Sequence, residues 1–177
     1  MAGAGSLLIS PSRARIKRCY LNVRNRPERI PAALFGFLWV LMRRIVIDTN
    51  VFVAAGFNPR SAAACILAAV REGRFQLIWN EPTRRETELI LRQIPHLDWE
   101  SVADLFQPKT EFLGTVDPNS FVLVPDPEDR KFAALSAAAQ TPLVTNDNHL
   151  LSHKHSIGVD VLTPHAFVAR ARLAGAK

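Results

Sequence analysis

The sequence contains little cysteine, and its two cysteines are far apart. Cys19 and Cys65 have no metal-ligand spacing, and the 177-residue chain contains no further thiol that could complete such a set. Two cysteines that are far apart and have no metal-ligand spacing fit a reducing compartment. We therefore predict a cytoplasmic location.

Apolar segments of membrane-spanning length are also missing. The apolar run at residues 32–42 is shorter than the ~20 residues that a membrane helix needs. Its basic flank is followed by no cleavage site of the Ala-x-Ala kind, which argues against a signal peptide. The Arg-rich, acid-poor segment before it also fits a mitochondrial-type targeting sequence. We predict no membrane partner.

Acids are nearly absent from residues 1–43, which contain eight basic residues and one acid, Glu28, for a net charge of +7. Because the whole chain carries +6, the remainder carries −1, and the isoelectric point near 10.0 is not evidence of nucleic-acid binding. Residues 1–42 show no sustained apolar period. We predict that they form an extension that is either disordered or a start-site artefact with translation beginning at Met42, and that residues 43–177 form one domain.

The strongest pattern in that domain is the run Ile45-Val46-Ile47, followed by Asp48, Thr49 and Asn50. Three β-branched apolar residues in succession are typical of a parallel strand that is buried on both faces. A carboxylate at the carboxyl end of such a strand points into the crevice where open α/β sheets bind ligands. The same three polar residues are also good turn and N-cap residues, so the run alone does not decide between the two roles.

The rest of the chain alternates between strand and helix patterns. Strands are predicted at residues 44–47, 75–79, 121–124, 142–145 and 159–162. Helices are predicted at residues 58–73, with Ser61 as N-cap, and at 83–93, 99–106, 127–139 and 164–172. This alternation predicts an α/β fold, a three-layer α/β/α sandwich with a central, mostly parallel sheet.

Acids recur where these elements begin or end. Asp147 follows Thr145-Asn146 at a strand end and so repeats the pattern of Asp48. Asp129 would be the third residue of a helix capped by Asp126, which gives it a structural role as well. Glu86 and Glu88 share a helix but point about 200° apart, so only one of them can face a cleft shared with Asp48.

Carboxylates that gather at one edge repel one another unless a cation neutralises them. A hard cation, Mg²⁺ or Mn²⁺, is the natural candidate because these ions prefer oxygen ligands. We interpret His149, His153 and His155 as surface residues, because histidine clusters favour softer metals.

From about Arg43 onward the chain resembles the PIN-domain family, the nuclease fold of VapC-type toxins. The resemblance rests on residues 45–52 (IVIDTNVF), 126–132 (DPEDRKF) and 143–147 (LVTND), with Glu86 at the place of the family's second acid. The Thr-Arg-Arg segment before Glu86 is more polar than the family pattern, so Glu88 stays an alternative. Residues 1–41 have no counterpart in the family.

The resemblance implies a ribonuclease that depends on Mg²⁺ or Mn²⁺ and hydrolyses RNA phosphodiester bonds. It implies that Asp48, Glu86, Asp129 and Asp147 surround the metal, with Asn50 and Thr145 holding the carboxylates. It further implies the toxin component of a toxin–antitoxin pair, with a cognate antitoxin as partner and a homodimer as the assembly.

Two other function classes stay open. A PIN-like module that binds RNA or a partner without cutting would usually have lost an acid. A phosphoacceptor receiver or phosphatase would need paired acids near the first strand and a late lysine, and Asp48 has no acidic neighbour.

Overall fold

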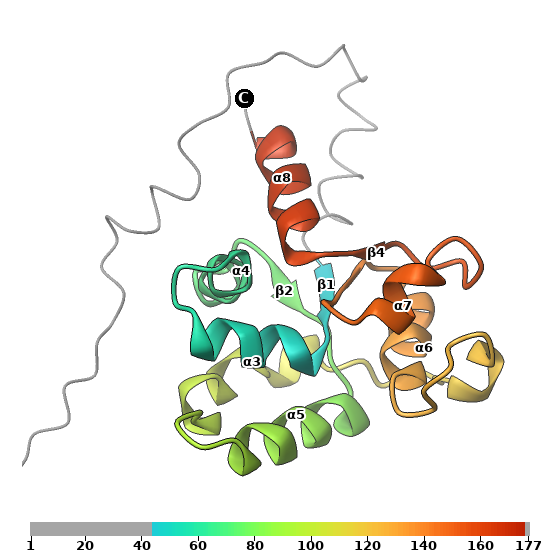
Figure 1. The fold of residues 1–177 in the computed structure, drawn as a ribbon, viewed down its shortest axis with the longest axis horizontal. Coiled ribbons are helices and arrows are strands. Elements are labelled where there is room, and N and C mark those ends of the chain that lie inside the picture. The colour runs from blue at the N-terminus through green and yellow to red at the C-terminus, as the bar shows by residue number, and fades with distance from the viewer. Residues whose placement is uncertain (1–43, 176–177) are drawn as a thin grey trace, which may run out of the picture.

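A computed structural model describes residues 44–175, which build a parallel sheet between helices (Figure 1). The sheet has four strands in the order β2-β1-β3-β4, every neighbouring pair being parallel. The strands are β1 (Arg44–Ile47), β2 (Gln76–Leu77), β3 (Leu143–Val144) and β4 (Val161–Leu162). The predicted extension at residues 1–42 lies outside the described residues.

Alternate residues of β1 enter two separate cores. Ile45 and Ile47 belong to one core, and Val46 belongs to the other. The first core is covered by α3 (Thr49–Phe57), α4 (Ala62–Arg71), α5 (Glu81–Gln93) and α8 (Pro164–Gly175). The second is covered by α6 (Arg130–Ala139) and α7 (Asn148–Ser152). Helices on both faces confirm the predicted three-layer α/β/α sandwich (Figure 1).

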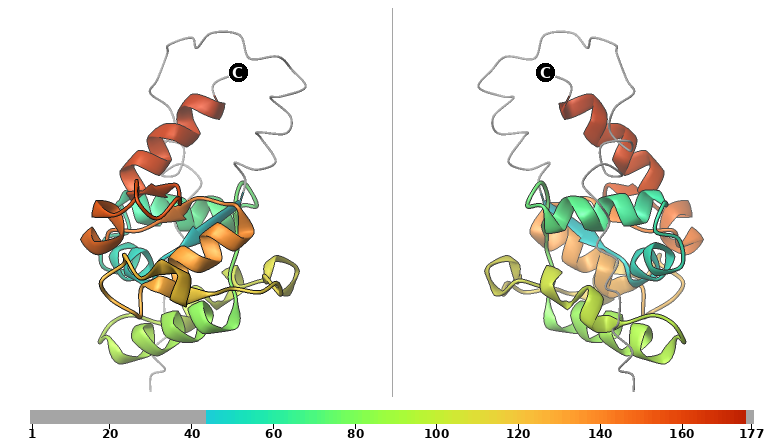
Figure 2. Two further views of the ribbon diagram at one scale, coloured as in Figure 1. Left: turned by 90° about the vertical axis from the view of Figure 1, so that its right-hand side faces the viewer. Right: turned by 90° about the vertical axis from the view of Figure 1, so that its left-hand side faces the viewer.

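Side-chain caps start α4 and α5, and the cap at Ser61 was predicted from the sequence. The Ser61 side chain accepts a hydrogen bond from the backbone N–H of Ala64 at 3.1 Å and starts α4. Asn80 and Thr83 form a capping box at the start of α5, with Pro82 in its first turn. Each such cap stabilises a helix by about 1 kcal/mol. Helix α8 projects from the body of the domain, as the turned views show (Figure 2).

Two predicted elements are wrong. Residues 121–124 form no strand: the 3₁₀-helix η4 (Pro118–Phe121) precedes a turn, in which Val122 and Leu123 are 67% and 53% exposed. Residues 99–106 form the 3₁₀-helices η1 (Trp99–Ser101) and η2 (Ala103–Leu105) instead of an α-helix. An α-helix would place Trp99 and Leu105 roughly 120° apart, whereas both enter the first core. The next segment is a further 3₁₀-helix, η3 (Pro108–Thr110).

Two helices begin directly after strand ends and were not predicted. Asp48 is the N-cap of α3, and Asp147 is the N-cap of α7. The Asp147 carboxylate accepts from the backbone N–H of His149 at 2.6 Å and of Leu150 at 3.4 Å. These strand-end acids can therefore cap a helix and line a crevice at the same time.

No single helix within residues 44–175 is long and apolar enough to span a membrane. The pair α3 and α4, which is bent by 105°, meets that test of length and composition when the two helices are taken together.

Candidate functional site

The carboxyl ends of β1 and β3 lie side by side and bring two polar segments together. The backbone N–H of Asp48 donates to the carbonyl oxygen of Val144 at 3.0 Å. The Asp48 carboxylate, whose residue is only 3% exposed, accepts from the hydroxyl of Thr145 at 2.5 Å and from the amide Nδ2 of Asn50 at 2.8 Å. These two side chains therefore fix the orientation of Asp48.

The same side chains tie the two strand ends to each other. The Asn50 Oδ1 accepts from the backbone N–H of Asn146 at 3.0 Å. The Thr145 hydroxyl oxygen accepts from the backbone N–H of Asp147 at 2.8 Å. Asp48 and Asp147 are consequently held in one hydrogen-bonded unit, although they are almost a hundred residues apart in the chain.

Burial makes ionisation of Asp48 costly. Burial is the main reason why the pKa of Asp48 rises to about 7. The charges of Asp129 and Glu86 contribute to the rise, and the hydrogen bonds from the Thr145 hydroxyl and the Asn50 backbone oppose it.

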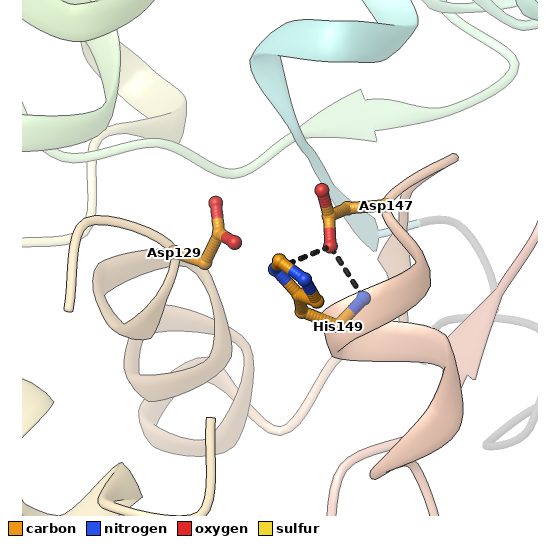
Figure 3. Close-up of side chains that lie close together, drawn as sticks. All are labelled: Asp129, Asp147 and His149. Atoms are coloured by element: carbon orange, nitrogen blue, oxygen red, sulfur yellow. Dashed lines mark hydrogen bonds and ion pairs between the residues drawn. The ribbon is translucent and has the colours of Figure 1, made fainter. Parts of the chain in front are cut away.

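Asp129 and Asp147 face each other across the gap between α6 and α7, with His149 beside them (Figure 3). One ligand atom from each of the three residues lies within 4.8 Å of the other two. Burial and the charges of Asp147, Asp126 and Glu86 raise the pKa of Asp129 to about 6. Asp129 thus belongs to the same group of acids as Asp48.

The predicted capping role of Asp129 is wrong. Helix α6 begins at Arg130, so Asp129 precedes the helix, and its side chain caps no backbone N–H. The local turn is closed by Asp126, whose carboxylate accepts from the backbone N–H of Glu128 at 2.9 Å. The Asp129 carboxylate is left to face Asp147, the N-cap of α7.

Glu86 and Glu88 point in different directions, as their spacing predicts. Glu86 Oε1 accepts from the Thr49 hydroxyl at 3.0 Å, and its Oε2 lies 2.6 Å from the Lys131 ammonium. Glu88 instead forms ion pairs with Arg84 and Arg92, both at 3.0 Å. Since the charge of Glu86 also acts on Asp48 and Asp129, Glu86 is the glutamate that lies with the other acids.

A protein-family model described as PIN domain matches residues 44–149, which is more than half of the chain. The chain belongs to the PIN-domain family. No curated protein and no solved structure matches it. PIN domains are generally nucleases and typically bind a divalent metal, so the chain has a nuclease-type fold. This result decides against the receiver-like alternative.

The acids of this PIN domain fit a hard divalent cation. Burial raises the pKa values of Asp48 and Asp129, and the charges of neighbouring acids add to the rise, so a cation beside them would favour their ionised forms. Opposite ligands of octahedral Mg²⁺ lie about 4.2 Å apart, because each is 2.0–2.1 Å from the ion. The ligand atoms of Asp129, Asp147 and His149 lie within 4.8 Å of one another, so the two aspartates are near enough to share one ion.

Sequence reasoning missed two residues of the PIN-domain site. His149 is exposed, as predicted, but its Nδ1 lies 3.8 Å from Asp147 Oδ1. Lys131 forms ion pairs with Glu86 and Glu128. Burial alone would lower the pKa of Lys131, but the bonds to these two carboxylates outweigh it and raise the pKa. The only available signal was their position, each two residues after a predicted acid.

Proposed function

We propose that this PIN domain is an endoribonuclease that depends on Mg²⁺ or Mn²⁺. The observation that carries the proposal is the gathering of Asp48, Glu86, Asp129 and Asp147 at one edge of the sheet, with raised pKa values at Asp48 and Asp129. Acids with perturbed pKa values cluster at functional sites, and a dication would favour the ionised form of each acid beside it.

The four acids have different surroundings. Asp129 and Asp147 face each other and would hold the ion most directly. The orientation of Asp48 is fixed by hydrogen bonds from Thr145 and Asn50. These bonds support the predicted role of the two residues in holding the carboxylates. Glu86, on α5, is the fourth acid of the group and accepts a hydrogen bond from the Thr49 hydroxyl.

The chemistry expected of a bound ion is to acidify a water and to neutralise charge on the phosphate and the leaving oxygen. The chain's own contribution is to fix the carboxylates. Hydrogen bonds that link Asp48, Asn50, Thr145 and the backbone of Asp147 hold the two strand ends before any ligand arrives. Such preorganisation avoids the cost of ordering the acids during the reaction.

The choice of RNA as substrate, and the wider biological role, rest on the resemblance of the three motif segments to VapC-type toxins. On that basis we propose that the protein is the toxin component of a toxin–antitoxin pair. A cognate antitoxin, a homodimeric assembly and a cytoplasmic location belong to the same proposal.

The test is cleavage of single-stranded RNA by the full chain in Mg²⁺, Mn²⁺ or EDTA. Cleavage should require the ion, and Glu86→Gln should lower the rate by at least ~10-fold. Glu88→Gln is the matched control, because Glu88 lies on the same helix but pairs with Arg84 and Arg92; its rate should stay near that of the wild type.

Two results would contradict the proposal. Cleavage that continues in EDTA would exclude the metal dependence. RNA that is bound but not cut in either ion would favour the alternative, a PIN-like module that binds RNA without cleaving it.

A further inference from the structure

Lys131 is an unusually enclosed lysine beside the acidic site. Its side chain is 16% exposed, and its ammonium nitrogen lies 2.6 Å from Glu86 Oε2 and 2.5 Å from Glu128 Oε2. Glu128 is 80% exposed, and an ion pair to such a residue contributes little. Glu86, which is 22% exposed, is therefore the partner that holds the ammonium in place.

Both oxygens of Glu86 are already engaged by the protein. Oε1 accepts from the Thr49 hydroxyl at 3.0 Å, while Oε2 contacts the Lys131 ammonium. A cation that bound Glu86 Oε2 would displace the Lys131 ammonium or lie beside it. The two positive charges would repel each other strongly at such short range.

Asp129 and Asp147 are in the opposite situation. Their carboxylates face each other with His149 beside them (Figure 3). Among residues 44–175, neither forms an ion pair with a lysine or an arginine. The acids of the site thus differ: Lys131 already neutralises Glu86, whereas Asp129 and Asp147 have no lysine or arginine partner among the described residues.

We propose that Lys131 takes the place of a second divalent ion beside Glu86, so that the site holds one ion, on the side of Asp129 and Asp147. Lys131 is then a positioning residue, because it acts through Glu86. The inference rests on the proposed function, and it sets this site apart from two-metal sites, whose ions lie about 3.5–4 Å apart and stabilise both the attacking and the leaving oxygen.

The experiment counts Mn²⁺ ions bound to the full chain, by calorimetric titration and by electron paramagnetic resonance of the free ion. The wild type should bind one ion in the site. Lys131→Met leaves the Glu86 carboxylate uncompensated and should bind two. The double variant Lys131→Met with Glu86→Gln removes both charges and should return to one.

Two further variants serve as controls. Lys131→Arg keeps the positive charge and should bind one ion. Glu128→Gln removes only the exposed partner of Lys131 and should also bind one. The melting temperature in EDTA supplies a readout that needs no ion: Lys131→Met should melt lower than the wild type, and the added Glu86→Gln should recover part of the loss, because it removes the unpaired carboxylate.

The outcomes separate this inference from the proposed function. A wild type that binds two ions, or a folded Lys131→Met variant that binds one, overturns the inference and leaves the proposed function standing. A wild type that binds no ion overturns both. A wild-type count of two overturns the inference even if Lys131→Met does not fold.

Discussion

Asp48 is almost fully buried, yet its ionised form is the one that a metal site needs. Its pKa is about 7, compared with the ordinary value of 3.8, because burial disfavours the charge. As the pH rises above 3.8, the unfolded chain releases a proton that the folded chain keeps. The free energy of unfolding of the metal-free protein should therefore fall by up to ~1.4 kcal/mol per pH unit until the folded group ionises near pH 7.

The corresponding prediction concerns Asp48→Asn. In EDTA at pH 8 the variant should melt at a higher temperature than the wild type, since the buried charge is gone, and the difference should shrink towards pH 4. Metal-dependent RNA cleavage should be lost, because one acid of the site is missing. Melting curves at the two pH values and a cleavage assay test this. Undiminished cleavage, or a lower melting temperature at pH 8, would contradict it.

Some residues of the site follow from local sequence, and others do not. Asp48, Asn50, Thr145 and Asp147 were found because each follows a buried apolar run, and parallel strands bring such ends to one edge. Lys131 follows no such rule. Its contact with Glu86 depends on how α6 packs near α5, which is a property of the tertiary structure.

At the scale of the elements, the start of α6 decides what Asp129 does. The sequence predicts Asp129 as the third residue of a helix that begins at residue 127. Helix α6 begins only at Arg130, and the Asp129 carboxylate caps no backbone N–H. The Asp129→Asn variant should therefore lose little stability. It should lower the apparent Mg²⁺ affinity or the turnover by at least ~10-fold if the carboxylate helps to hold the ion.

The measurement is a Mg²⁺ titration of the cleavage rate for the wild type and Asp129→Asn in parallel, with a melting curve for each. Two superimposable titration curves would remove Asp129 from the site and leave Asp48, Glu86 and Asp147. A large drop in melting temperature would instead indicate a structural role that the hydrogen bonds do not reveal.

The strands that end at the site were predictable, whereas the helices α3 and α7 that begin there were not. Buried strands and capped helices have strong local signals, such as Ser61 before α4 and Pro82 in α5. The segment at 121–124 has a strand-like apolar run, but only Val124 of its last three residues is buried. Helix α3 was not predicted, because the residues from Asp48 to Asn50 are as typical of a turn as of the start of a helix.

For the whole molecule, the charge distribution leads to a prediction about residues 1–41. The basic excess lies in residues 1–43, whereas the family match begins at residue 44. A chain that begins at Met42 should keep the melting temperature and the cleavage rate of the full chain. A decrease of several degrees, equivalent to ~1 kcal/mol or more, would show that the apolar run at 32–42 contributes to the stability of the domain.

The hydrogen bond between Thr145 and Asp48 joins residues 97 positions apart. During synthesis the first strand therefore leaves the ribosome long before the residues that complete its acidic edge. A nascent chain that ends before Thr145 contains Asp48 and Glu86 but neither Asp147 nor the hydroxyl that orients Asp48. Nuclease activity of the kind proposed can then arise only after Thr145 and Asp147 have been synthesised and have left the ribosome.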